Sequence, residues 1–110
     1  MDKITVYLDD CRPKPSKFDL LCRTAEEVIE LIKQDKVSFV SLDNDLGEGY
    51  SEGKTVAQFI EKSYLSGEIK FVDFHPHTSN PVAWDEIMAC KRNVYKKFKE
   101  NLEKENECYD

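Results

Sequence analysis

Three short apolar segments, each followed by polar residues, constrain the fold of this chain more than any other feature. The segments "KITVYL" (3–8), "VSFVSL" (37–42) and "IKFVDF" (69–74) are rich in β-branched and aromatic residues, which is typical of buried strands. Sequences with helical periodicity separate them. Strands that alternate with helices predict a parallel sheet with right-handed crossover connections.

The sequences between the strands carry helix signals. Thr24 followed by Glu27 forms a capping box, which predicts a helix from about Ala25 to Gln34. A second helix is predicted to end near Gly67 because apolar residues recur before it at helical spacing. These residues are Val56, Phe59, Ile60 and Tyr64.

Asn80 and Pro81 are a good cap and first-turn pair, and they predict the start of a long third helix. We expect its apolar stripe to belong to the core and its basic residues to form a solvated face. The stripe contains Trp84, Ile87, Met88, Tyr95, Phe98 and Leu102, and the basic residues are Lys91, Arg92, Lys96, Lys97 and Lys99. The charged tail from about residue 103 is predicted to fray.

The chain of 110 residues is expected to form one domain, 1–110, with no internal repeat or dividing linker. "CRPKPSK" (11–17) must be an exposed loop because two prolines exclude helix and central strand, and "FDLLC" (18–22) is a candidate short strand. We therefore predict an α/β fold, a small three-layer sandwich around a short, mostly parallel sheet of three or four strands. Such a sheet is truncated relative to a five-stranded doubly wound domain.

Composition excludes several classes of function. The net charge of −6 argues against binding along duplex nucleic acid, which requires many neutralised phosphates, but it allows a local contact with one phosphate. No segment has the length or hydropathy for crossing a bilayer. The four cysteines form no C-x-x-C pair, so neither a zinc site nor a redox motif is indicated. We expect a cytoplasmic protein with free thiols.

The candidate chemistry lies where the predicted strands end. The first strand is followed by Asp9 and Asp10, the second by Asp43 and Asp45, and the third by His75, His77, Thr78 and Ser79. Carboxyl ends of parallel strands meet at one edge of the sheet, which is where such folds bind ligands. Four neighbouring carboxylates would repel one another without a cation. This predicts a site for Mg²⁺ or Mn²⁺ at Asp9, Asp10, Asp43 and Asp45.

The two histidines offer further chemistry at this edge. They either shift the metal preference towards manganese or zinc, or serve as acid and base. Residues two apart on an extended backbone point the same way, so His75 and His77 are expected to face one pocket, with Pro76 stiffening the chain between them.

Two features predict a phosphate beside the metal. Arg12, with Lys14, lies in the loop after the first acids, and arginine binds phosphate in bidentate fashion. The start of the third helix, with Ser79 and Asn80, offers free amides and a favourable dipole.

Each of these residues also has a purely structural interpretation. An Asp-Asp pair after a strand is commonly a turn, Asp45 and Asn80 are common caps, and His75 can be a half-buried residue with satisfied hydrogen bonds. The coincidence of polar residues after three strands, rather than any single residue, favours a functional site.

Three motifs together resemble the cyclic-phosphate processing receiver domains. They are "LDDCRPKP" (8–15), "SLDNDLGEG" (41–49) and "HTSNPVAWDEIM" (77–88), which match the family's L-D-D-x-R-x-x-P, S-L-D-x-D-L and H-S/T-x-N-P patterns in order. The resemblance implies a receiver-like fold and a role on 2',3'-cyclic phosphate or related phosphate ends, of RNA or a nucleotide, beside RNA-repair partner proteins.

Carried over by position, the resemblance implies roles for individual residues. Asp9, Asp10, Asp43 and Asp45 correspond to the acidic cluster, Arg12 to the phosphate contact, His77 with Thr78 to the catalytic or binding pair, and Asn80 to a residue that orders the loop. Many relatives have a histidine where this chain has Asn44, and His75 is the candidate to replace it.

The leading hypothesis is a metal-assisted phosphoesterase of the cyclic phosphodiesterase type. Asp10, Asp43 and His77 are its predicted catalytic residues, and the predicted substrate contacts are Arg12, His75, Thr78, Ser79 and Asn80. One alternative is a non-enzymatic module that binds a nucleotide or a protein. A second is a phospho-accepting receiver switch, which is disfavoured because no later strand supplies the lysine that such receivers use.

Overall fold

The computed structural model describes residues 3–9, 13–43 and 52–107, without the side chains of 52, 106 and 107. Four strands and three helices occur in these residues. In chain order they are β1 (Ile4–Leu8), β2 (Leu20–Cys22), α1 (Ala25–Lys33), β3 (Val37–Leu42), α2 (Glu52–Leu65), β4 (Asp73–Pro76) and α3 (Pro81–Glu107). The chain is therefore an α/β domain, as its alternating patterns predict.

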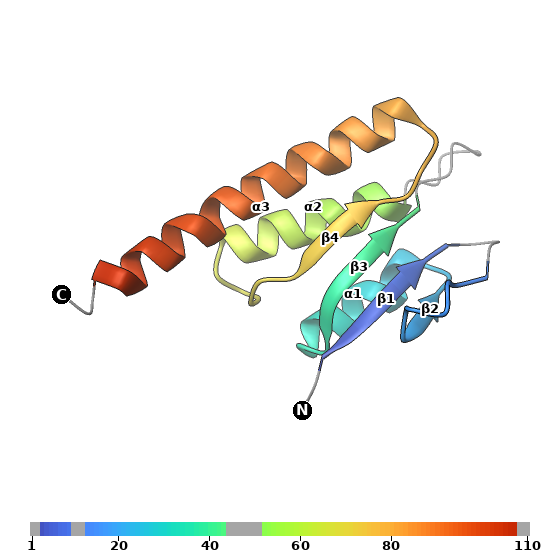
Figure 1. Ribbon diagram of the computed structural model, residues 1–110, viewed down its shortest axis with the longest axis horizontal. Coiled ribbons are helices and arrows are strands. Elements are labelled where there is room, and N and C mark those ends of the chain that lie inside the picture. Colours follow the sequence, from blue (N-terminus) through green and yellow to red (C-terminus); the bar gives the residue numbers. More distant parts are fainter. Residues whose placement is uncertain (1–2, 10–12, 44–51, 108–110) are drawn as a thin grey trace.

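The four strands form one parallel sheet in the order β2-β1-β3-β4. Strand order reverses beside β1, because β2 pairs on one side of it and β3 and β4 follow on the other. All carboxyl ends consequently lie at one edge (Figure 1). This confirms the prediction of a truncated, receiver-like parallel sheet, and it fixes the edge where a ligand site is expected.

Helices α1 and α2 pack on the same face of the sheet and contact each other. Figure 1 shows both behind the strands. The long α3 packs against α2 and runs along β4, the outer strand on that side. It thereby covers a sheet edge that would otherwise expose unpaired backbone groups.

The face opposite α1 and α2 is covered mainly by side chains. Phe18, from the segment before β2, packs against Tyr7 and Phe39, and α3 reaches this face with residues that contact β4. The described residues thus form the predicted small α/β fold, with α1 and α2 on one face of the sheet and α3 along β4. The described segment between β1 and β2, residues 13–19, contains no helix that would form a further layer there.

Local signals in the sequence set the helix ends. The Thr24 hydroxyl accepts a hydrogen bond from the Glu27 amide at 3.3 Å and donates to the Glu27 carboxylate at 3.1 Å, so Thr24 caps the helix as predicted. Helix α2 ends in a turn in which Gly67 has a φ of 82°. That left-handed conformation favours glycine, and the Glu68 amide then reaches the Ser63 carbonyl at 2.8 Å.

One continuous core joins the sheet to the three helices. Val6, Leu8, Val40, Leu42 and Phe74 come from the sheet, and each is at most 1% exposed. These alternate residues point towards the helices, so the intervening residues of β1, β3 and β4 belong to the opposite face. That alternation decides which side chains reach the candidate site.

The third strong strand lies later in the chain than its apolar pattern predicts. We expected 69–74, whereas β4 spans Asp73–Pro76 and pairs with β3 from Phe39 onward. Phe71 belongs instead to an aromatic cluster with Tyr64, Tyr95 and Phe98. The first part of the apolar run therefore packs against α2 and α3 instead of joining the sheet. Because the strand begins later, His75 lies inside β4 rather than after it.

The apolar stripe predicted for the third helix is only partly correct. Ile87 is buried, but the aromatic and leucine residues at the stripe's margins are exposed, because α3 is covered on one side only. The exposed residues are Trp84, Tyr95 and Leu102, and the buried ones of α3 are Ala83, Ile87, Cys90 and Val94. The helix continues to Glu107, and fraying of the tail stays a prediction.

Two buried thiols give the fold a measurable dependence on pH. Burial raises the pKa of Cys22 to about 11, with Glu27 adding to the effect. Burial also raises the pKa of Cys90 to about 11, with Glu61 and Glu86 adding to the effect. An unfolded cysteine has a pKa of about 8.5, so the folded state retains these protons at pH values where the unfolded state releases them.

We expect the free energy of unfolding to be unaffected by these thiols below about pH 8 and to fall as pH rises from there towards 11. At pH 8 iodoacetamide should modify Cys22 and Cys90 much more slowly in the native chain than in urea, as peptide mass spectrometry would measure. Cys90→Ala should flatten the alkaline slope. Native-state labelling of both residues at the rate of the unfolded chain would contradict this expectation.

Candidate functional site

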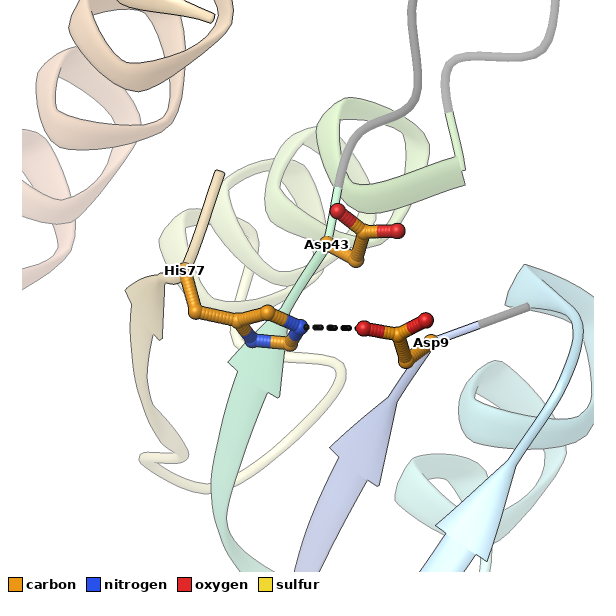
Figure 2. A group of neighbouring side chains, drawn as sticks. All are labelled: Asp9, Asp43 and His77. Carbon is orange, nitrogen blue, oxygen red and sulfur yellow. Dashed lines mark hydrogen bonds and ion pairs between the residues drawn. The ribbon is translucent and has the colours of Figure 1, made fainter. Parts of the chain in front are cut away.

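Asp9, Asp43 and His77 lie together just beyond the carboxyl ends of β1, β3 and β4 (Figure 2). Each offers one ligand atom, a carboxylate oxygen or a ring nitrogen, and these three atoms lie within 4.8 Å of one another. Asp9 is 1% exposed, while Asp43 and His77 are partly exposed. Asp9 therefore forms the buried bottom of the site, and Asp43 and His77 lie on its side open to solvent.

Backbone hydrogen bonds between neighbouring strands fix the position of each of these residues. The Asp9 amide donates to the Cys22 carbonyl at 3.1 Å, and the Asp43 amide to the Leu8 carbonyl at 3.0 Å. The His77 amide donates to the Leu42 carbonyl at 2.8 Å. The site thus continues the parallel ladder by one residue in each strand, which places it on a rigid element.

The ring of His77 is held on three sides. Its Nε2 lies 3.2 Å from the Asp9 Oδ2, and its Nδ1 lies 2.6 Å from the Ser41 Oγ. Tyr7 stacks on the ring with centroids 4.3 Å apart and planes 6° apart. A carboxylate only accepts, so in this arrangement Nε2 carries a proton, and in the neutral ring Nδ1 accepts from the Ser41 hydroxyl.

A residue that follows β2, Arg23, also contacts the buried bottom of the site. The Arg23 guanidinium donates from Nη1 to the Asp9 carbonyl at 3.1 Å. This contact places a positive charge beside the end of β1, where Asp9 and Asp43 concentrate negative charge. Arg23 was not among the residues singled out from the sequence, because nothing in its local pattern indicates that the edge strand brings it to the same end of the sheet.

The three residues fit a divalent cation by the chemistry and spacing of their atoms. Ligands of one ion at about 2.1 Å lie at most about 4.2 Å apart, so a small change of rotamer would bring this group into range. Two carboxylates suit a hard ion such as magnesium or manganese, and a nitrogen ligand from His77 would shift the preference towards manganese or zinc. His77 would have to give up its contact with Asp9 or Ser41 to become such a ligand. The predicted oxygen-only set is not tested, since Asp10 and Asp45 lie outside the described residues, as do Arg12 and Asn44.

Thr78, Ser79 and Asn80, which were predicted to contact substrate, lie between β4 and the start of α3. The Asn80 side chain accepts a hydrogen bond from the Val82 amide at 3.0 Å, and the Asn80 amide donates to the Thr78 hydroxyl at 3.2 Å. Asn80 therefore caps the helix, in line with its structural interpretation. Ser79 is exposed and Thr78 is partly buried. Substrate contacts by these three residues stay predictions.

His75 points to the same sheet face as His77 but has different partners. Lys91 on α3 lies with its Nζ 3.1 Å from the His75 Nδ1 and 3.7 Å from Asp73. Burial and the Lys91 charge lower the pKa of His75, against a smaller opposite effect of Asp73. Lys91 was predicted to lie on a solvated face, but its side chain is only 17% exposed.

Sequence reasoning also missed Ser41 and Tyr7, although a signal for both is present. Each lies two residues before a site aspartate on the same strand, so strand alternation places its side chain on the face of that aspartate. The convergence of both with His77 depends on the order of the strands, which the sequence pattern leaves open.

The parallel sheet, with acidic residues just beyond its two central strands, is compatible with a receiver-like domain. The family model for the cyclic-phosphate processing Receiver domain matches residues 4–93, and the chain belongs to this family. Comparisons with curated proteins and with solved structures found no match. Among the described residues, no helix is long and apolar enough to cross a membrane.

Proposed function

We propose that this domain is a metal-assisted phosphoesterase that opens a cyclic phosphate or removes a terminal one, with 2',3'-cyclic phosphates of RNA or nucleotides as the leading substrates. The observation that carries the proposal is the group of Asp9, Asp43 and His77 at the ends of three adjacent strands. Membership of a family associated with cyclic-phosphate processing supports the choice of substrate.

The charges of the site suit this reaction. Asp9 and Asp43 would hold a manganese or magnesium ion, with Asp10 and Asp45 as further predicted ligands, and such an ion polarises phosphoryl oxygens and lowers the pKa of bound water. Asp9 is buried and paired with His77, so its position is set before a substrate arrives. Little rearrangement is then needed on binding.

Asp43 and His77 each carry out one of the two proton transfers that ring opening requires. A water oxygen bonds to phosphorus, the ring P–O bond breaks, and the water proton passes to Asp43, the more exposed of the two carboxylates. His77, which carries a proton on both ring nitrogens for this step, gives its Nε2 proton to the leaving oxygen and becomes a neutral ring with its remaining proton on Nδ1. Proton exchange with solvent then restores both groups. Arg12 and Thr78 are proposed to orient the phosphate, which would hold the substrate close to the geometry required for reaction.

The direct test is hydrolysis of 2',3'-cyclic nucleotides by metal-stripped protein with and without added Mn²⁺ or Mg²⁺. We expect metal-dependent turnover, and we expect Asp43→Asn to lower it by more than about 100-fold. Residues that merely support a metal ligand contribute roughly 10- to 100-fold, so a direct ligand should contribute more.

Asp85→Asn is the matched control, because it makes the same change at an exposed position on α3. It should keep full activity. The proposal fails if Asp43→Asn hydrolyses cyclic nucleotides as fast as the unaltered protein. Tight nucleotide binding in calorimetry without turnover would instead favour a non-enzymatic binding module.

A receiver switch is the second candidate, and the position of Asp43 favours it. A partly exposed aspartate just after β3, next to a buried acid just after β1, would suit a phosphate acceptor. Acetyl phosphate or beryllofluoride with Mg²⁺ would then modify Asp43. The absence of a mass shift and of ¹⁹F signals from a bound fluoride, under conditions that modify ordinary receivers, would exclude this function.

A further inference from the structure

We propose that the site has a nucleobase subsite, formed by Trp84 and His75, beside the group of Asp9, Asp43 and His77. This inference rests on the proposed function and narrows it, because it makes a nucleoside phosphate, rather than any small cyclic phosphate, the preferred ligand. It rests on three side chains that the phosphate chemistry leaves unused: Trp84, His75 and Lys91.

The first step is the position of His75. It lies two residues before His77 on one face of the sheet, so the two side chains start roughly 6.6 Å apart. Ser41, which contacts His77, is the register partner of His75 on β3. A ligand with its phosphate at His77 therefore extends over His75 if it lies along β4, and a ribose gives about the required separation.

The second step is the hydrogen-bonding state of His75. An ammonium group donates and cannot accept, so the contact of Lys91 with the His75 Nδ1 makes that nitrogen an acceptor. The neutral ring then carries its proton on Nε2. Lys91 is itself anchored by Asp73 at 3.7 Å, and Tyr95 donates to the same carboxylate at 2.7 Å. His75 is thereby held as a hydrogen-bond donor.

The third step is the exposed indole of Trp84. Its ring meets His75 edge-on, with centroids 5.3 Å apart and planes 86° apart, yet 37% of the residue remains exposed. Trp84 and Lys91 are seven residues apart and share one stripe of α3. The first turn of α3 lies on the side of the molecule towards which β4 runs, at the carboxyl edge of the sheet (Figure 1).

An exposed aromatic ring next to a fixed N–H donor is suited to a nucleobase. The base has a π face for stacking and ring nitrogens or carbonyls that accept hydrogen bonds. A cyclic phosphate of glycerol has neither. Because stacking tolerates any base, the subsite predicts a preference for nucleosides over simple alcohols with little discrimination among the four bases.

Trp84 is the single tryptophan of the chain and therefore reports directly on the subsite. We expect adenosine 2',3'-cyclic phosphate to change its fluorescence, excited at 295 nm, while glycerol 1,2-cyclic phosphate and inorganic phosphate do not. Trp84→Ala should raise KM for the adenosine compound roughly 10-fold and leave kcat/KM for the glycerol compound unchanged. Trp84→Phe should recover most of the loss.

Val82→Ala is the matched control, because Val82 is 64% exposed and lies on another side of the same helical turn. It should behave like the unaltered protein with both substrates. The subsite is excluded if Trp84→Ala affects both substrates equally, or neither, while hydrolysis proceeds. A fluorescence response without turnover would exclude the proposed reaction and keep the subsite, so the two failures are distinguishable.

Lys91 acts in this proposal as a positioning residue, and its role needs a separate readout. Lys91→Met keeps much of the side-chain volume but removes the donor to His75. We expect the ring ¹⁵N shifts of His75 to move away from the Nε2–H tautomer, together with a rise in KM for the adenosine compound only. Unchanged ¹⁵N shifts would show that Lys91 does not set the state of the ring.

Discussion

Replacing His77 by alanine is expected to lower the hydrolysis of a 2',3'-cyclic nucleotide by about 10²- to 10⁴-fold, the range for a general acid. The reason is geometric. The Nε2 of His77 is 3.2 Å from Asp9, and both lie within 4.8 Å of Asp43, so an imidazole N–H lies directly beside the two acids. Steady-state rates at saturating metal would measure the loss.

The choice of leaving group separates the two roles open to His77. If His77 protonates the leaving oxygen, the variant should retain far more activity on bis(p-nitrophenyl) phosphate, because nitrophenolate leaves without a proton. If His77 is only a metal ligand, both substrates should lose activity equally. If the variant loses only a little activity on both substrates, His77 has no role in the reaction.

Folding must be checked in the same experiment, because the His77 ring also has a structural role. Its loss removes one hydrogen bond from the buried Asp9 carboxylate and one from the Ser41 hydroxyl, and such bonds contribute about 0.5–1.5 kcal/mol each, or about 1.5–3 kcal/mol to a charged group. His77→Gln keeps a side-chain amide in place of the ring. It should restore stability better than it restores turnover, so comparing the two variants separates packing from chemistry.

The sequence predicted the central part of this site because strand ends are local features. Asp9 and Asp43 each follow an apolar strand, and parallel strands bring their ends together whatever packs on their faces. His75 and His77 were predicted to face one pocket. They lie on the same face of the sheet because they are two residues apart in extended chain, but they contact different residues, and a shared pocket stays a prediction.

Features that depend on long-range packing could not be predicted in this way. Lys91 lies in a basic segment whose pattern resembles a solvated face, and its burial follows from α3 lying along β4. The apolar run at 69–74 was assigned to a strand because its composition suits one, but Phe71 packs with Phe98 on α3 instead. In both cases tertiary contacts override a local preference.

A second large effect is expected in the core. Phe74→Ala should lower the free energy of unfolding by about 3–5 kcal/mol, because Phe74 is fully buried and its loss leaves a cavity between the sheet and the helices. A domain of this length is stable by only about 5–15 kcal/mol, so the change removes a large part of the total. Urea unfolding monitored by circular dichroism would measure it.

Leu65→Ala is the surface control, since Leu65 is exposed near the end of α2 and should change stability by less than about 0.5 kcal/mol. Phe74→Leu should lose only about 1 kcal/mol, because it retains most of the buried volume. A loss for Phe74→Ala no larger than for Leu65→Ala would contradict the position of Phe74 in the core.

The two large effects should also be independent of each other. The Phe74 side chain points to the helices, while its neighbour His75 points to the opposite face with His77 and the acids. A destabilised Phe74→Leu protein that is still folded at low temperature should therefore keep its kcat per folded molecule. His77→Gln should show the reverse, with stability largely retained and kcat lost, because the sheet separates the packing of one face from the chemistry of the other.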